Sequence, residues 1–316
     1  MRTLVLGGAG FIGSHLVDRL LSEGHRVRVL DNLSTGKREN LAKVAGDVEL
    51  RIGDIRDEAA LASALADVEV VFHQAAIVSV TRSVEEPLAT QSTNLTATLQ
   101  LLVAARAANV RRVVFASSAA VYGAGSDSAL TESMPTLPQS PYGLEKLAGE
   151  HYLRIWRELH GLESVALRYF NVFGARQDPS SPYSGVISIF AERIARGVAP
   201  TIYGDGEQTR DFVHVSNVVQ ANVLAGFTPS AEGVFNVACG ETTSLNRLFT
   251  QMCQLSGVAL EPQYGPARSG DIRHSSADIS RAAALLGYVP RVTLPDGLAA
   301  LFEDLRDINR NVRRER

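Results

Sequence analysis

Three residues have the types and spacing of a proton-transfer site: Ser118, Tyr142 and Lys146. Tyr142 and Lys146 stand four positions apart in a stretch of helical pattern, so they would share one face of a helix. A free tyrosine, with a pKa near ~10, is a poor base at neutral pH, but a cation one turn away favours the phenolate. We therefore expect Tyr142 to take a proton from a substrate hydroxyl as a general base, with Ser118 sharing that hydroxyl.

A glycine-rich stretch near the N-terminus indicates a dinucleotide partner for this base. An apolar run of strand length, residues 3–6, precedes three glycines spaced G-x-x-G-x-x-G, and leucines at helical spacing follow. A tight glycine turn lets a pyrophosphate approach the backbone, and the helix N-terminus attracts its charge. The cofactor contacts expected in this stretch are Gly7, Gly10, Phe11, Ile12 and Gly13.

An acidic residue at the end of the next strand selects the cofactor. Residues 26–30 are predicted to form this strand, and Asp31 follows it, roughly twenty residues past the glycines. An acid there accepts hydrogen bonds from the ribose hydroxyls of NAD and repels the 2′-phosphate of NADP. Further cofactor contacts are expected after strands, at Asn32, Asp54, Ile55, Gln74, Ala75 and Ala76. A plain strand-to-helix turn with an Asp cap explains Asp54 equally well, and close helix packing also explains the alanines.

Strands and helices alternate through the first half of the chain, which predicts an α/β fold with a Rossmann-type doubly wound parallel sheet. The expected strands cover residues 3–6, 26–30, 49–52, 68–73, 113–116 and 164–169. The expected helices cover residues 57–65, 94–108 with Asn94 as cap, and 142–160 between a Ser140 cap and Gly161. Ser118 would then stand at the carboxyl end of a strand, where open α/β sheets bind ligands.

The alternation weakens beyond Asn171, which predicts a smaller and less regular α/β substrate domain. Helices are expected over residues 186–196, 245–255 and 278–286, and a short strand over 201–203. We place an NAD-binding domain at residues 1–170 and a nucleotide-sugar-binding domain at residues 171–316. Residues 210–215 and 234–237 resemble strands that return to the first domain.

Composition excludes several classes of protein. A formal net charge of −3 over 316 residues argues against nucleic acid as the main partner. Cys239 and Cys253 lie outside any metal-ligand or disulfide pattern, so we expect no metal and a reducing compartment. No apolar run reaches the ~18 residues of a membrane span, which favours the cytoplasm. Helix 94–108 is apolar on nearly every side, so we expect a homodimer formed through it and helix 142–160.

The motifs GGAGFIG, SSAAVYG, YGLEK and RYFNVFG, together with Asp31, resemble those of the extended short-chain dehydrogenases/reductases along nearly the whole chain. Within that superfamily the chain resembles the UDP-hexose 4-epimerases, and TIYGDGEQTRDFVHV and RSGDIRHSSADISRA belong to this likeness. The resemblance implies that tightly held NAD takes a hydride from C4 of the sugar while the tyrosinate takes the hydroxyl proton. The 4-keto sugar then turns over in the site, and the hydride returns to its other face.

The resemblance also implies contacts with both ligands. Lys146 would hold the nicotinamide ribose as well as favour the phenolate. Substrate contacts are implied near the sugar and phosphate at Asn171, on the diphosphate at Arg210 and Arg268, on the uridine ribose at Asp271 and against the uracil at Tyr203. Guanidinium groups suit phosphate geometry. For Val186, a contact in the nucleotide site and packing of a helix in the core explain the sequence equally well.

Two further positions bear on the reaction and the sugar. Ala119 and Ala120 stand where related dehydratases and decarboxylases carry an acid, which favours epimerisation. In the family, a tyrosine at the position of Ser275 goes with UDP-glucose and UDP-galactose alone, and a small residue goes with N-acetylated sugars too. We therefore expect UDP-N-acetylglucosamine and UDP-N-acetylgalactosamine as substrates, together with UDP-glucose and UDP-galactose. The alternatives are an epimerase of UDP-glucose only, a UDP-glucuronate 4-epimerase, and a non-catalytic dinucleotide sensor.

Overall fold

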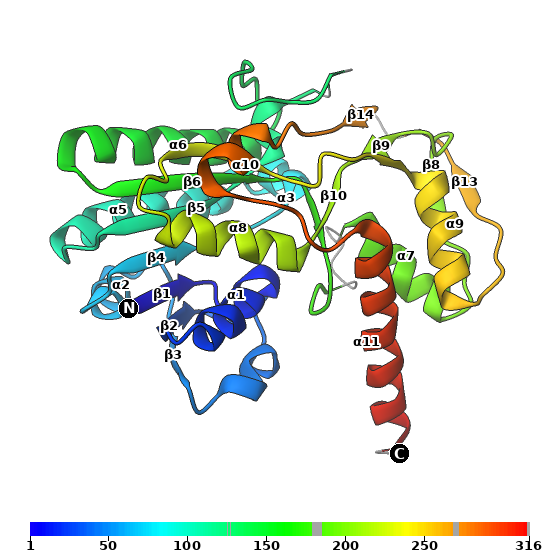
Figure 1. Cartoon of the computed structure of the whole chain (residues 1–316), viewed down its shortest axis with the longest axis horizontal. Coiled ribbons are helices and arrows are strands. Elements are labelled where there is room, and N and C mark those ends of the chain that lie inside the picture. Colours follow the sequence, from blue (N-terminus) through cyan, green and yellow to red (C-terminus); the bar gives the residue numbers. More distant parts are fainter. Residues whose placement is uncertain (125, 127, 179–184, 268–271, 315–316) are drawn as a thin grey trace.

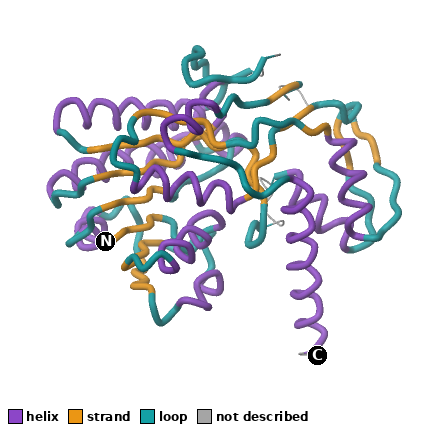
Figure 2. The backbone as a smooth tube through the Cα atoms, viewed as in Figure 1, coloured by secondary structure: helices purple, strands orange, loops and turns teal. Residues whose placement is uncertain are grey.

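The computed structural model describes residues 1–124, 126, 128–178, 185–267 and 272–314. Within these residues, seven parallel strands form one sheet (Figure 1; Figure 2). In spatial order they are β11 (Gly233–Val237), β6 (Glu163–Tyr169), β5 (Arg112–Ser118), β4 (Val70–His73), β1 (Arg2–Leu6), β2 (Arg26–Asp31) and β3 (Val48–Ile52). The order turns back between β1 and β4, where a doubly wound sheet opens its ligand crevice. The predicted Rossmann-type sheet is confirmed.

Helices cover both faces of this sheet (Figure 1). One face carries α1 (Phe11–Ser22), η1 (Arg38–Val44), α8 (Val215–Phe227) and α10 (Ser280–Leu286). The other face carries α2 (Glu58–Leu65), α5 (Ala97–Ala107) and α6 (Pro141–His160). Strands covered on both faces are mostly apolar, and Leu4, Val5 and Leu6 of β1 are fully buried.

The chain leaves the sheet after β6 and returns to it at β11. Val237 pairs with Tyr169, so residues 233–237 are the strand next to β6. Residues 210–215, which were also expected to return to the first domain as a strand, do not pair with this sheet. They form β9 (Thr209–Arg210) and β10 (Phe212–His214), and β10 pairs instead with β7 (Asn171–Phe173) in a separate small sheet. The buried Asp211 carboxylate, which accepts the N–H groups of Cys239 and Gly240, holds this segment beyond the end of β11.

The rest of the second half forms a smaller unit around its own apolar core (Figure 1). Its remaining elements are α7 (Val186–Ala195), β8 (Thr201–Tyr203), β12 (Thr243–Ser244), α9 (Leu245–Ser256), β13 (Gln263–Gly265), β14 (His274–Ser275) and α11 (Leu294–Arg314). The short helix η3 (Ala119–Tyr122) instead follows β5 directly and contacts α6. Phe173, Phe190 and Phe249 are buried in this core. Helix α11 packs on it and then runs away from the body of the molecule.

The segment before α5 differs from the expected helix 94–108. Helical structure begins earlier, with α3 (Val80–Glu85) and α4 (Pro87–Gln91), and continues through a π-helical turn, η2 (Ser92–Thr96), into α5. Asn94 therefore does not cap a helix N-terminus. It lies inside the π turn and is buried. Its side-chain amide is satisfied by hydrogen bonds with the backbone of Ile77 and with Glu145.

In the described part of the chain, no helix has the length and apolar character needed to cross a membrane. The same residues contain no cluster of three or more histidine, cysteine, aspartate or glutamate side chains that could hold a metal ion. Cys239 and Cys253 are free thiols.

Candidate active site

The three proton-transfer residues come together at the carboxyl end of β5. Ser118 is the last residue of that strand, and its hydroxyl is hydrogen-bonded to Tyr142. Helix α6 begins just before Tyr142, because Ser140 caps it by accepting the N–H of Gly143 at 3.1 Å and Pro141 fills its first position. Lys146 lies one turn further along. Its ammonium donates to the carbonyl of Ala116 at 2.8 Å and lies 5.8 Å from the centre of the Tyr142 ring.

Burial opposes charge on both members of this pair. Tyr142 is 6% exposed and Lys146 is 3% exposed. Burial raises the pKa of Tyr142 to about 12, and the hydrogen bond with Ser118 offsets only part of that rise. Burial lowers the pKa of Lys146 to about 8, against the opposing charge of Glu145. Desolvation is thus the largest influence on the pKa of Tyr142 in the protein itself, whereas the expected lowering of that pKa depends on the nicotinamide ring of NAD⁺ as well as on Lys146.

The glycine turn has the geometry of a pyrophosphate cradle. Gly7 adopts a φ of +76°, and a Cβ there would come within 2.8 Å of Ala75 in the loop after β4. A Cβ on Gly13 would overlap the Gly7 carbonyl oxygen. No side chain caps the N-terminus of α1, where Gly10 is the cap residue, so its first N–H groups point out of the turn without a side-chain acceptor. Together these features fit a dinucleotide phosphate.

Replacing Gly13 with Ala is expected to reduce the NAD content of the purified protein several-fold, and to lower its melting temperature, because the new methyl group pushes the turn open. Gly46→Ala is the matched control, since its Cβ would meet no atom within 4 Å. The measurement is bound NAD per chain after denaturation, with the melting temperature of each protein. Equal NAD content in the two variants would contradict a cofactor role for the turn.

Asp31 is fixed at the end of β2. Its Oδ2 accepts the N–H of Ala9 at 2.9 Å and its Oδ1 accepts the N–H of Leu33 at 2.8 Å. The carboxylate thus joins the glycine turn to the loop that follows β2. Each oxygen keeps a second lone pair, so the carboxylate can still accept a ribose hydroxyl.

The next two cofactor positions differ from each other. Asp54 accepts a hydrogen bond from Asn32 and pairs with Arg56, which holds the pKa of Asp54 well below its usual range. It is not the cap of α2, which is Asp57. Ile55 is buried in the core of the sheet. Asn32 and Asp54 are therefore neighbours at the end of β2, whereas the Ile55 side chain is occupied by packing.

The loop after β4 lies against the glycine turn through its backbone. Ala75 makes the close approach to Gly7, so small residues are required here. The Gln74 amide does not face this approach: its Nε2 donates to Asn222 at 2.9 Å, and its Oε1 accepts from Tyr169 at 3.3 Å. Ala76 continues the loop towards Ile77.

Three of the expected substrate residues are brought together by strand pairing. Ser275 of β14 stands opposite Arg210 of β9. The backbone of Asp211 then accepts the Asn171 amide at 3.1 Å and donates to the Ser275 carbonyl at 3.0 Å. Arg210 donates to the carbonyl of Ile272 at 2.6 Å. Asn171, Arg210 and Ser275 therefore form one cluster beyond the sheet.

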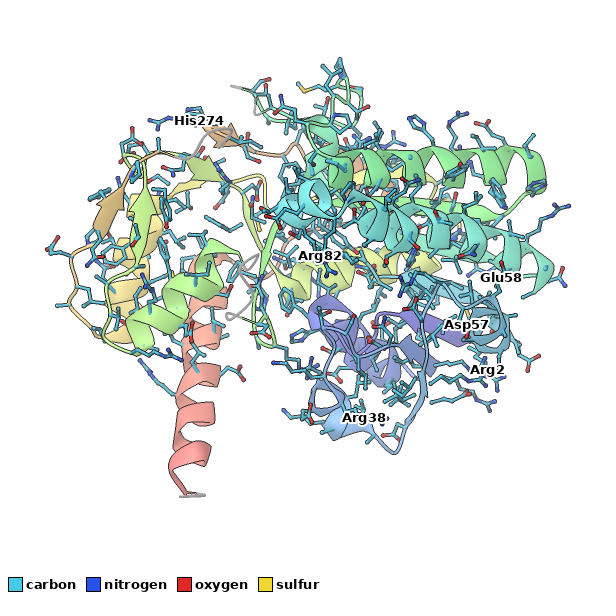
Figure 3. The ribbon with its side chains drawn as sticks, turned by 180° about the vertical axis from the view of Figure 1, so that it is seen from behind. Arg2, Arg38, Asp57, Glu58, Arg82 and His274 are labelled. Atoms are coloured by element: carbon cyan, nitrogen blue, oxygen red, sulfur yellow. The ribbon has the colours of Figure 1, made fainter. Side chains whose placement is uncertain are left out.

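The other expected substrate residues do not join this cluster through a described contact. Tyr203 ends β8 and is 37% exposed. Val186 opens α7 and packs, half-buried, on the core of the second unit. Arg268 and Asp271 lie outside the described residues. Figure 3, viewed from behind, shows His274 of β14 on the second unit, far from Asp57 and Glu58 of α2.

Sequence reasoning missed three buried acids of the site. Asp211 accepts three backbone N–H groups, and burial raises its pKa to about 6. Glu150 pairs with Arg168 at 2.7 Å and accepts the hydroxyl of Ser117 at 2.5 Å, which fixes the end of β5 beside Ser118. Glu145 lies next to Lys146. Their partners are far away in the chain, and their neighbours in the sequence form no pattern that could have signalled them.

Comparison with known proteins adds to this geometry. Residues 3–238 match the NAD dependent epimerase/dehydratase family. A UDP-glucose 4-epimerase of Mycolicibacterium smegmatis is 45% identical over 312 residues, which cover 97% of this chain and 99% of that protein. Among solved structures, a UDP-glucose 4-epimerase of Thermotoga maritima with UDP-glucose is 40% identical, with a TM-score of 0.93 over 98% of this chain and 100% of that one. A UDP-N-acetylglucosamine 4-epimerase of Methanobrevibacter ruminantium in complex with UDP-N-acetylmuramic acid is 41% identical, with a TM-score of 0.93 over 97% of this chain and 98% of that one.

Proposed function

The chain belongs to the NAD dependent epimerase/dehydratase family, and we propose that it interconverts UDP-N-acetylglucosamine and UDP-N-acetylgalactosamine as well as UDP-glucose and UDP-galactose. It is an isomerase of UDP-hexoses that acts at C4 and uses NAD. One observation carries the chemistry: a buried tyrosine and a buried lysine meet a half-buried serine at the end of β5, at the same edge of the sheet as the glycine turn.

The residues of the chain divide the work of the reaction. Tyr142 removes the proton of the sugar 4-hydroxyl and later returns it, and Ser118 shares that hydroxyl through a hydrogen bond. Lys146 holds the nicotinamide ribose and, when charged, favours the phenolate. When bound, NAD supplies the hydride acceptor and a positive ring that also favours the phenolate. Gly7, Gly10, Gly13 and Asp31 are the proposed anchors of the cofactor.

The N-acetylated substrate rests on Ser275. This small residue stands opposite Arg210, the proposed diphosphate clamp, and is linked to Asn171 through the backbone of Asp211. A small side chain at this position leaves room beside C2 of the sugar. UDP-glucose alone and UDP-glucuronate are the competing substrates, and a dinucleotide sensor is the non-enzymatic alternative. A sensor would have no use for a buried Tyr142 paired with Lys146.

The test is proton NMR of the purified protein incubated separately with UDP-N-acetylglucosamine and UDP-glucose, without added NAD. Galacto-configured signals from both sugars are expected, and they would show that NAD stays bound through purification. Signals from UDP-glucose alone would remove the N-acetylated substrate and keep the chemistry. If neither sugar gives a signal even with NAD added, UDP-glucuronate is tested next. Turnover of UDP-glucuronate would make it the substrate, and no turnover would favour the dinucleotide sensor.

We also propose that the enzyme is a cytoplasmic homodimer formed through residues 94–108 and 142–160, with the cofactor unit and substrate unit divided near residue 170. Exposed apolar side chains on these helices support the interface: Val103 of α5, and Leu144 and Leu159 of α6. Sedimentation of the wild type and of Leu159→Glu would test it.

A further inference from the structure

Glu145 is a buried carboxylate on the catalytic helix that the proposed chemistry does not use. It is 4% exposed, and both of its oxygens have partners from the helical run before α5. Thr90 of α4 donates to Oε1 at 2.8 Å, and Asn94 of the π turn donates to Oε2 at 2.7 Å. Burying a charge is costly unless it is fully hydrogen-bonded, so this arrangement points to a specific role.

Asn94 connects Glu145 to the cofactor side of the site by hydrogen bonds. Its Oδ1 accepts the N–H of Ile77 at 2.8 Å, and its Nδ2 donates to the Ile77 carbonyl at 3.1 Å as well as to Glu145. Ile77 follows the Gln74–Ala76 loop that lies against Gly7. One polar chain, from Glu145 through Asn94 to Ile77, thus joins the helix that carries Tyr142 and Lys146 to the loop beside the glycine turn. Turns of π type often mark functional sites, and here the π turn contains Asn94.

The charge of Glu145 also acts on the proton-transfer pair. It opposes the burial that lowers the pKa of Lys146, and it adds to the burial that raises the pKa of Tyr142. Among the described residues, His73 of β4 is a second titratable group that interacts with Lys146. Burial lowers the pKa of His73 to about 3, so this ring is neutral at working pH, with Nε2 bonded to Thr98 at 2.9 Å.

We propose that Glu145 is a positioning residue that, through Asn94, holds the catalytic helix in register with the cofactor loop and supplies the counter-charge for Lys146. The proposal rests on the proposed function, because it assigns Tyr142 and Lys146 to that reaction. It predicts two separable effects. Loss of the hydrogen-bonded link from Glu145 through Asn94 should lower kcat, and loss of the charge alone should shift the ionisation of Tyr142 and Lys146 to lower pH.

Glu145→Gln removes the charge and can keep both hydrogen bonds. Its amide oxygen can accept from Asn94, while its nitrogen donates to the Thr90 hydroxyl, whose single proton then turns from residue 145 to the Pro87 carbonyl. Glu145→Ala removes the hydrogen bonds with Thr90 and Asn94 as well as the charge. Glu158→Gln is the matched control: it removes the same charge from an exposed position thirteen residues further along α6, where it pairs only with Arg154 among the described contacts.

In the holoenzyme, Glu145→Gln is expected to shift the ionisation of Tyr142 to lower pH. The ionisation is measured by tyrosinate absorbance, and the signal is assigned to Tyr142 by comparison with Tyr142→Phe. Both limbs of the pH–kcat profile should move the same way, because Lys146 also loses its proton earlier. Glu158→Gln should leave both curves unchanged. Glu145→Ala should lower kcat roughly 10–100-fold with KM within about twofold, as expected for a misplaced base.

A titration of Glu145→Gln that overlays the wild-type curve would overturn the proposal. So would a Glu145→Ala enzyme of full kcat. If Glu145→Ala does not fold, the titration of Tyr142 in Glu145→Gln is sufficient to test the proposal. Because the tyrosinate measurement needs no turnover, a wild type that is inactive on every UDP-sugar would defeat the proposed function without deciding this inference.

Discussion

Tyr142→Phe is expected to lower kcat for 4-epimerisation by roughly 10²–10⁴-fold, the usual contribution of a general base. The substitution removes one oxygen from a side chain that is 6% exposed, so the fold should be kept. KM for the UDP-sugar should change little, because the lost interaction matters in the transition state rather than in substrate binding. The measurement is initial rate against substrate concentration, with the melting temperature and bound NAD of each protein.

The matched control is Tyr152→Phe, which changes a tyrosine of the same helix whose ring packs against Trp156. This variant should keep wild-type kcat. A Tyr142→Phe enzyme that retained most of its activity would remove Tyr142 as the base and leave Lys146 as the group to test. A Tyr142→Phe protein that lost all turnover but kept full biological function would instead revive the dinucleotide sensor.

Ser275→Tyr is expected to abolish turnover of UDP-N-acetylgalactosamine, by about 10²-fold or more, and to spare UDP-galactose. Ser275 is 7% exposed and stands opposite Arg210, and in the proposed mode of binding a phenol ring there would occupy the space beside the sugar. An acetamido group at C2 would lose that space, whereas a hydroxyl would still fit. The measurement is kcat/KM for the two sugars with the same enzyme preparation.

His274→Tyr provides the control for this substitution. His274 is the neighbouring residue of β14 and is exposed, because successive side chains of a strand point to opposite faces (Figure 3). It should leave the ratio of the two kcat/KM values unchanged. Equal loss on both sugars in Ser275→Tyr would defeat the proposed role of Ser275 in substrate choice.

Local patterns were sufficient to predict the sheet and its catalytic edge. The apolar run of β1, the glycine turn and the Ser140 cap act over a few residues, and each lies where it was expected. Helix α6 also ends where predicted, since Gly161 adopts the left-handed conformation that stops a helix. The Tyr142–Lys146 pair follows from that helix alone.

Features that depend on distant partners were not predicted. Helix α8 is packed against both the sheet and α1, so it lacks a polar face and has no amphipathic signal. Its buried Asn217 and Asn222 are satisfied by residues far along the chain, at Val292 and Tyr169. The burial that raises the pKa of Tyr142 could not be predicted for a related reason: desolvation depends on the whole fold, whereas the spacing shows only the nearby lysine.

The return of the chain to β11 has a consequence for synthesis and folding. Because β6 gains its outer neighbour only at residues 233–237, a nascent chain that ends near residue 170 presents an unpaired strand edge. Such edges invite pairing with other chains, and contacts of large sequence separation form slowly. The cofactor unit should therefore aggregate when it is expressed alone as residues 1–170, and become soluble only when residues 171–237 are supplied in the same polypeptide.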